Sequence, residues 1–334
     1  MAKIKDIAQL TGFSITTVSR VLNQDKSFNV SDETRLKIMT VAEELNYLPP
    51  SKRHKVGKTE SVMNIGLVYW YSVEDELTDP YYLSIRLAIE KHCEEQGIHL
   101  HKCYLKSKSL DELKDLNVEG IIALGKYSDQ ELQTLHDKFP HIVLVDCWTN
   151  HYNIDVVVGD LKNATRQIIN HFKSQQFKSI GFICGVEKTL DGEELLDIRL
   201  VTFSKEMKKT KDFNQYDIKL GKFTADSGYD IMSSIIASDA LLDCYIVASD
   251  AMAMGCLKAL NEHHIRVPDV VSIISYDNIS LSQYTIPSLS TIDMNTKHLG
   301  TTAMELMKER LTNDREIAKK VMIPTNLILR DSSL

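Results

Sequence analysis

The stretch IAQLTGFSITTVSRVLNQDKSFNVSDETRLKIMTVAEELN, residues 7–46, sets the organisation of the chain. Its apolar residues recur at the three- and four-residue spacing of amphipathic helices. They form three groups along the chain: Ile7, Ala8 and Leu10, then Val18, Val21 and Leu22, then Ile38, Val41, Ala42 and Leu45. This pattern predicts three short helices packed around one small core.

The first two of these helices are joined by a tight turn. Gly12 and Phe13 end the first helix, and Ser14 is a preferred N-cap residue for the second. Ser31 is placed to cap the third helix in the same way. Two short helices joined so closely are typical of a helix-turn-helix, whose second helix enters the major groove of DNA.

The first residues of that second helix would face the base edges. Arg20 can donate two hydrogen bonds to guanine, whereas Thr16 and Thr17 can bond a base or offer a methyl group. Ile15 can make only apolar contact. The remaining polar candidates, better suited to phosphates or to capping, are Ser14, Ser19, Asn23 and Asn29. The alternative is a small solvated helical bundle that binds no DNA.

Two segments carry a resemblance to a known family. IKDIAQLTGFSITTVSRVLNQ (4–24) and VSDETRLKIMTVAEELNYLP (30–49) resemble the head of the LacI/GalR family of bacterial transcriptional repressors. The resemblance continues through HFKSQQFKSIGFICG, VASDAMAMGCLKAL, VSIISYDNISLSQYTIPSLSTIDMN and IPTNLILRDS. It implies a homodimeric repressor that binds double-stranded operator DNA and is controlled by a small-molecule sugar.

Length and composition agree with a soluble, multidomain protein. The 334 residues are enough for two or three domains, and 43% are hydrophobic and 25% charged. No apolar run approaches the ~20 residues that span a bilayer, and the N-terminus lacks the layout of a signal peptide. We therefore expect a cytoplasmic protein without a membrane partner. The six cysteines form no C-x-x-C pair, so reduced thiols rather than a metal site are expected.

The charges divide unevenly along the chain. Residues 1–58 hold ten Lys or Arg against six Asp or Glu, which leaves 29 basic and 40 acidic residues in the remainder. A basic end is the expected footprint of phosphate neutralisation, while an acidic body would repel DNA.

A linker is predicted over residues 49–62. Pro49 and Pro50 end the third helix, because proline cannot donate within a helix and restricts the residue before it. In the family this linker folds into a hinge helix on DNA, and an apolar residue of each subunit enters the minor groove. Val56 stands where the family commonly has leucine, but Gly57 weakens a helix by ~1 kcal/mol relative to alanine. A flexible basic tether is the alternative.

From Met63 onward, short apolar runs alternate with longer helical stretches. Strand candidates such as GIIALG (120–125) and CYIVASD (244–250) alternate with helix candidates such as Tyr82–Gln96 and Ala251–His263. This alternation predicts two parallel sheets flanked by helices. The expected fold is thus an all-α helix-turn-helix head plus an α/β core of two doubly wound parallel-sheet lobes. The family resemblance implies that this core is periplasmic-binding-protein-like.

The resemblance also implies domain boundaries, with the head over 1–48 and the core over 63–334. The N-lobe would hold 63–160 plus 293–322, and the C-lobe 161–292 plus 323–334. Apolar residues on the stretches Tyr82–His92 and Ala251–Leu260 are candidates for the dimer interface.

The effector would bind where strand C-termini of the two lobes face each other. A sugar needs carboxylates and arginine for its hydroxyls and an aromatic ring for its apolar face. Tyr71 and Ser72 are expected to end the first strand. Strand ends and the resemblance together give the predicted effector set: Tyr71, Tyr81, Asp146, Trp148, Arg199, Phe223, Ser249, Asp250 and Asp277. Asp250 is equally suited to capping a helix, and the aromatic residues to core packing.

The effector itself is predicted from what the sequence lacks. No cluster of Lys and Arg suited to phosphate is evident, which favours a neutral sugar, and we expect galactose or a galactoside. Ser249 and Met294 differ from the asparagine and glutamine of some relatives. One alternative is a corepressor that strengthens DNA binding. Another is a sugar-acting hydrolase with Asp146 and Asp277 as acid and base. We expect no catalytic residue, cofactor or metal.

Overall fold

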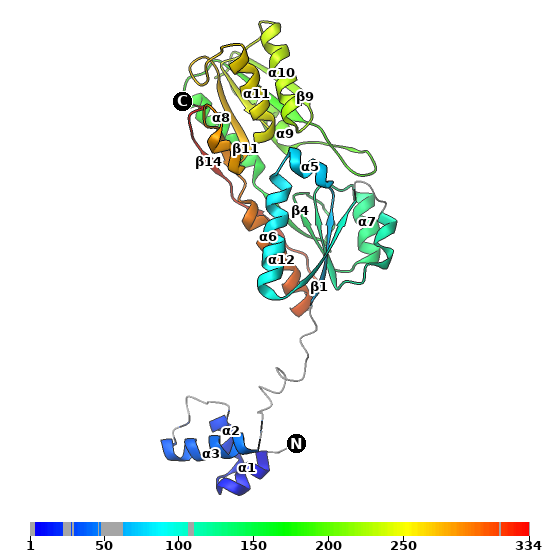
Figure 1. Cartoon of the computed structure of the whole chain (residues 1–334), viewed down its shortest axis with the longest axis vertical. Helices are drawn as coiled ribbons and strands as arrows, with labels where there is room; N and C mark the ends of the chain where they lie inside the picture. Colours follow the sequence, from blue (N-terminus) through cyan, green and yellow to red (C-terminus); the bar gives the residue numbers. More distant parts are fainter. Residues whose placement is uncertain are drawn as a thin grey trace. The chain divides into compact units, whose positions relative to one another are not determined.

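The computed structural model describes residues 4–22, 28, 30–45, 47, 63–105, 110–313 and 315–333. The chain divides into two compact units, Met1–Val62 and Met63–Leu334 (Figure 1). The predicted hinge, with Val56, and the predicted DNA contacts Asn23 and Asn29 lie outside the described residues.

The first unit contains the three predicted helices, α1 (Ile4–Thr11), α2 (Ile15–Leu22) and α3 (Asp32–Glu44). Its core is formed by Ile7, Val18, Val21, Leu22, Ile38, Ala42 and Tyr47. Gly12, at φ +74°, makes the turn between α1 and α2, a conformation that glycine adopts without strain. The Oγ atom of Ser14 accepts a hydrogen bond from the Thr17 amide at 3.1 Å, as predicted for an N-cap. The prediction was wrong for Leu10, whose side chain is 62% exposed.

The second unit contains two six-stranded sheets. The first sheet has the order β13-β5-β4-β3-β1-β2, and all its strands are parallel. Its strands are β1 (Asn64–Tyr69), β2 (His99–Tyr104), β3 (Gly120–Leu124), β4 (Ile142–Val145), β5 (Asp155–Gly159) and β13 (Lys320–Ile323). The helices of this lobe, hereafter the N-lobe, are α5 (Val73–Thr78), α6 (Tyr81–Gln96), α7 (Asp129–Lys138) and α12 (Thr296–Asn313), with a 3-10 helix at Leu110–Asp115.

The second sheet has the order β14-β12-β11-β10-β6-β9. Its strands are β6 (Ser179–Gly185), β9 (Gln215–Gly221), β10 (Cys244–Val247), β11 (Ser272–Asp277), β12 (Ser290–Asp293) and β14 (Asn326–Ile328). The helices of this C-lobe are α8 (Leu161–Ser174), α9 (Ile198–Met207), α10 (Ala225–Ala237) and α11 (Asp250–Glu262), with a 3-10 helix at Ser280–Tyr284. The edge strand β14 runs antiparallel to β12, so this sheet is not purely parallel as predicted.

Several short elements of the second unit were not predicted, namely β12, β13, β14, the two 3-10 helices and two further elements. The first is α5, whose N-cap is Ser72; the first strand therefore ends at Tyr69, before Tyr71 and Ser72. The second is a hairpin of β7 (Glu187–Lys188) and β8 (Glu194–Leu195). Both are too short to show a hydrophobic period, which is why the sequence pattern did not reveal them.

The helices proposed from sequence for the dimer interface turn most of their apolar side chains inward, although Leu87 of α6 is 51% exposed. On α6, Ile85 and Ile89 are fully buried, and on α11 Met252, Cys256 and Leu260 are as well. These buried residues pack within their own chain, and the interface stays a prediction for exposed apolar positions such as Leu87.

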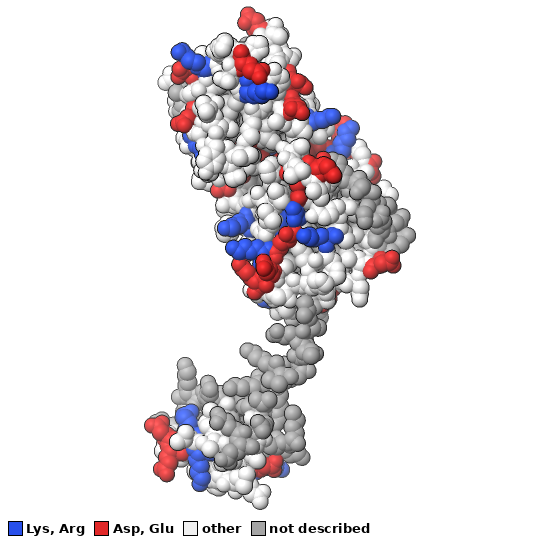
Figure 2. Space-filling view, in the orientation of Figure 1, with Lys and Arg blue, Asp and Glu red and all other residues white. Residues whose placement is uncertain are grey.

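On the face shown in Figure 2, acidic and basic side chains of the second unit are interspersed. None of the six cysteines, all within the described residues, forms a disulfide, and five of them are buried. In the described part of the chain, no helix has the length and apolar character needed to cross a membrane.

Candidate functional site

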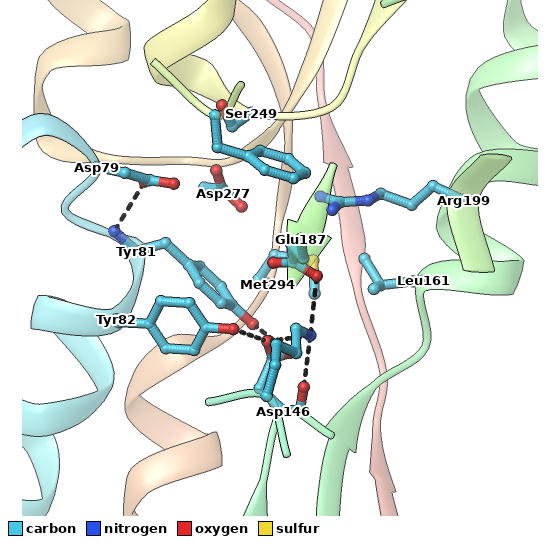
Figure 3. Close-up of a pocket in the computed structure, with 12 residues that line it drawn as sticks. Asp79, Tyr81, Tyr82, Asp146, Leu161, Glu187, Arg199, Ser249, Asp277 and Met294 are labelled. Carbon is cyan, nitrogen blue, oxygen red and sulfur yellow. Dashed lines mark hydrogen bonds and ion pairs between the residues drawn. The ribbon is translucent and has the colours of Figure 1, made fainter. Parts of the chain in front are cut away.

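A cleft of about 360 Å³ lies between the two lobes, where strand C-termini of both sheets end. The residues that line it come from both sheets: Asp79, Tyr81, Tyr82, Lys126, Asp146, Leu161, Glu187, Arg199, Phe223, Ser249, Asp277 and Met294 (Figure 3). Six of the nine predicted effector residues are therefore brought together: Tyr81, Asp146, Arg199, Phe223, Ser249 and Asp277.

On the N-lobe side, Asp146 is the centre of a hydrogen-bonded group just after β4. Tyr81 donates to its Oδ1 atom at 3.0 Å and Tyr82 donates to its Oδ2 atom at 2.7 Å. Lys126 forms an ion pair with the same Oδ2 atom at 2.8 Å. Although burial alone would lower the pKa of Lys126, the charges of Asp146 and Glu187 raise it. These contacts hold Asp146 in one orientation at the cleft.

On the C-lobe side, Arg199 is held by Asp197, the N-cap residue of α9. The Arg199 Nε and Nη2 atoms donate to the Asp197 carboxylate, and Nη1 donates to the Ala248 carbonyl oxygen at 2.6 Å. The guanidinium also lies over the rings of Phe223 and Tyr276, at 5.0 and 5.4 Å. Burial by itself would raise the pKa of Asp197, but the charge and hydrogen bonds of Arg199 have the larger effect, so the pKa of Asp197 is lowered. Sequence reasoning did not identify Asp197 as the partner of Arg199.

Asp79 and Asp277 face the cleft from opposite lobes (Figure 3). Asp79 precedes α6 and accepts a hydrogen bond from the Tyr81 amide at 3.2 Å, while Asp277 ends β11 at φ +109°. Burial raises the pKa of Asp79 to about 6. Burial, followed by the charges of Asp79 and Asp250, raises the pKa of Asp277 well above its ordinary value. Two buried carboxyl groups with so few donors in the chain are suited to accept hydrogen bonds from a ligand.

Ser249 and Asp250 have different roles. Ser249 lines the cleft and is the N-cap of α11, accepting from the Met252 amide at 3.2 Å. Asp250 is fully buried behind it and accepts hydrogen bonds from Thr291 at 2.7 Å, from the Ile279 amide at 2.8 Å and from Ser275. Its oxygens thus tie three segments of the C-lobe together, and it does not line the cleft.

Two further predicted residues lie outside the cleft lining. Trp148 is 54% exposed, although it follows β4. Tyr71 packs edge-on against Tyr82 with ring centroids 4.7 Å apart, and it stacks on Trp70. Tyr71 therefore supports Tyr82 from behind.

Six residues of the lining are absent from the predicted effector set: Asp79, Tyr82, Lys126, Leu161, Glu187 and Met294. Lys126 follows β3 by two residues and Glu187 follows β6 by two, so the rule that sites lie at strand C-termini would have found both. Leu161 begins α8 and carries no chemical signal in the sequence.

The predicted DNA contacts within the described residues gather on α2. Ile15, Thr16 and Arg20 are exposed, and Thr17 and Ser19 are half-buried. The guanidinium of Arg20 lies 5.1 Å from the centroid of the Phe28 ring, within the range of a cation–π contact. This surface offers the mixture of donors and apolar groups that reads base edges.

A metal centre has no basis in the part of the chain that the structure describes. No three His, Cys, Asp or Glu side chains come together there with the spacing of metal ligands. The cations in the cleft are the chain's own Lys126 and Arg199.

Comparisons with known proteins agree with this architecture. Residues 3–50 match the family of bacterial regulatory proteins described as the lacI family, and residues 169–333 match a periplasmic binding protein-like domain. The HTH-type transcriptional regulator GalR of Lacticaseibacillus casei is 38% identical over the full length of both chains.

Two solved structures share the fold. The lac repressor dimer bound to operator and the anti-inducer ONPF has a TM-score of 0.71 and 22% identity, covering 100% of this chain and 99% of its own. The complex of the transcriptional regulator CelR with cellobiose has a TM-score of 0.70 and 22% identity, covering 100% of both chains.

Proposed function

The chain belongs to the LacI family of bacterial regulatory proteins, and we propose that it represses transcription until a neutral sugar of the galactose type releases it from its operator. The proposal rests above all on the balance of charge in the cleft. Four carboxyl groups line it, from Asp79, Asp146, Glu187 and Asp277, against only two cations. Because regulation requires access to chromosomal DNA, we place the protein in the cytoplasm.

Both cations are already paired. Lys126 is bound by Asp146 and Glu187, and Arg199 by Asp197. A phosphorylated sugar or a sugar acid would bring further negative charge without a free cation to meet it. A neutral sugar instead donates its hydroxyls to the carboxylates and places its ring against Phe223. CelR and the lac repressor bind a sugar or a sugar analogue in their solved complexes, which supports this ligand class.

We propose the domain organisation implied by the resemblance: a head over 1–48, a linker over 49–62 and the two-lobed core over 63–334. The sugar acts by shifting the core between two states, since a ligand moves such an equilibrium only by its differential affinity. Coupling of about 1–3 kcal/mol is typical of these switches. A hydrolase is not supported, because the named relatives are regulators.

The test measures fluorescence anisotropy of labelled duplexes from upstream of the protein's own and neighbouring genes. We expect tight binding without sugar and release on adding galactose or a galactoside, with no effect of galactose phosphates. Tighter binding on adding the sugar would instead favour a corepressor, and a duplex that is ignored under all conditions would reject the function.

Arg20→Ala is expected to weaken cognate operator binding by about 1–3 kcal/mol, because Arg20 can form a paired hydrogen bond to guanine. Binding to unrelated duplexes should change little. Electrophoretic mobility shifts with both duplexes measure the two effects. Arg35→Ala, on α3 of the same unit, is the matched control, because it removes one positive charge away from α2. Equal losses on both duplexes would show that Arg20 contacts phosphate.

We propose that the protein acts as a homodimer, because a single head contacts too few bases. Three large apolar side chains are exposed within six residues of the C-lobe, namely Leu281 (56%), Tyr284 (75%) and Ile286 (91%). Such a group on a soluble protein is typical of an interface. Ile286→Glu is expected to convert the dimer to monomer in sedimentation velocity, whereas Lys258→Glu on the exposed face of α11 should not.

A further inference from the structure

We propose that the hairpin over residues 187–195 is a clasp between the lobes that holds Glu187 in the cleft as a further effector-contacting residue. The inference rests on the proposed sugar response, because the clasp acts on the same cleft. It concerns contacts between the two lobes of the second unit, which are all within the described residues.

The clasp is an ordered structure rather than an open loop. It leaves the C-lobe sheet at the end of β6, and Glu187 and Lys188 of β7 pair antiparallel with Leu195 and Glu194 of β8. The Thr189 amide donates to the Glu193 carbonyl oxygen at 2.9 Å, which closes the turn. The hairpin then returns to α9, the helix that bears Arg199, and Figure 1 shows it reaching from the C-lobe towards α7.

The tip of the clasp is bound by the N-lobe at the start of α7. Ser128 Oγ donates to Asp191 Oδ2 at 2.7 Å, and the Asp191 amide donates to Glu131 Oε1 at 2.8 Å. The other oxygen of Glu131 accepts from the Ser128 amide at 2.9 Å. Glu131 therefore both caps α7 and binds the tip of the clasp. Leu190 adds an apolar contact by packing against the core of the N-lobe. Because Glu131 is only 5% exposed, its carboxylate needs these donors in place of hydrogen bonds to water.

The base of the clasp reaches the cleft. Glu187 Oε2 lies 3.6 Å from Lys126 Nζ, and Lys126 in turn binds Asp146. Burial also raises the pKa of Glu187. Within the described residues the carboxylate of Glu187 makes this ion pair and no hydrogen bond, so it keeps acceptor positions for a hydroxyl of the sugar.

Both ends of the clasp therefore join the C-lobe to the N-lobe, and moving the lobes apart would break both. A sugar that binds between the lobes gains affinity from any contact that favours the closed arrangement. Loosening the tip should weaken sugar binding although Asp191 does not line the cleft. Replacing Glu187 should do so through the lost acceptor.

The first experiment titrates galactose against the operator complex of the full chain and three variants. Asp191→Ala and Glu187→Gln are expected to raise the half-release concentration about tenfold, the effect of losing one charge-assisted hydrogen bond. Lys188→Ala is the control, because its exposed side chain pairs only within the hairpin, with Glu194 at 3.0 Å; a change below about twofold is expected there. Curves that superimpose for all variants would overturn the proposal.

The second experiment needs no sugar and separates the clasp from the proposed function. Hydrogen exchange of the sugar-free wild-type chain should show the Asp191 amide protected at least about tenfold relative to an open loop. Exchange at open-loop rates would overturn the clasp. If the Asp191 amide is protected but no sugar releases the wild-type chain from DNA, the result would instead count against the proposed effector.

Discussion

Arg199→Ala is expected to abolish the response to sugar while the head still binds its operator. Arg199 lines the cleft, lies over Phe223, and is fixed by Asp197 and by the Ala248 carbonyl oxygen. The substitution removes the donors that face the effector from the C-lobe. It also leaves Asp197, whose side chain is 8% exposed, as a buried carboxylate without a counter-charge. Breaking one side of such a pair costs about 3–5 kcal/mol of stability.

The two consequences are separated by the double variant Asp197→Asn, Arg199→Ala. Chemical denaturation should show a large stability loss in the single variant and recovery of most of it in the double variant, because the stranded charge is gone. Calorimetric titration with galactose should show no binding to either. A double variant that binds sugar like the wild type would remove Arg199 from the effector site.

Asp79→Asn is expected to stabilise the protein near neutral pH and to weaken sugar binding. Burial raises the pKa of Asp79 from 3.8 to about 6, so the folded chain holds this proton more tightly than the unfolded chain. Stability from this group is therefore greatest below about pH 4 and falls as pH rises towards about 6. Above that pH the full cost of ionisation is present, up to about 3 kcal/mol. Asparagine cannot ionise and removes that cost.

The sugar-binding loss follows from the same charge. At neutral pH the Asp79 carboxylate offers a charged acceptor to a hydroxyl, and an amide oxygen is a weaker one. Thermal unfolding between about pH 4 and pH 8 measures the stability difference, which should appear only on the neutral side. Asp230→Asn, at an exposed position of α10, is the matched control. An unfolding profile parallel to that of the wild type at every pH would contradict the assignment.

The sequence was most informative where local rules decide the structure. The helical period of Ile7, Val18, Val21 and Ile38 predicted the head, and Ser14 and Gly12 predicted its turn, because helices and caps depend on residues three or four positions apart. Alternation of apolar runs with helical stretches likewise predicted two sheets flanked by helices. The helical period was misleading at Leu10, whose side chain is 62% exposed.

The site was predicted only in part. Asp146, Arg199, Phe223 and Asp277 were found because polar or aromatic residues at strand C-termini, together with the family resemblance, mark a site without coordinates. Asp250 satisfied the same rule, but its neighbours are Ser275, Ile279 and Thr291, so its oxygens are directed into the C-lobe. The sequence cannot distinguish a residue such as Asp277, which faces the cleft, from Asp250, which does not. A shift of one position along the chain changes the side of the strand end to which a side chain points.

By itself, the sequence determined that a helix-turn-helix head precedes a two-lobed α/β core, since periodicity and turn chemistry are written in neighbouring residues. The tertiary structure alone decided which polar side chains pair: Arg199 with Asp197, Lys126 with Asp146 and Glu187, and Asp191 with Ser128 across the lobes. Those pairs are formed by folding, which brings together residues that in most cases lie far apart in the chain, and their energies depend on burial that no local pattern records.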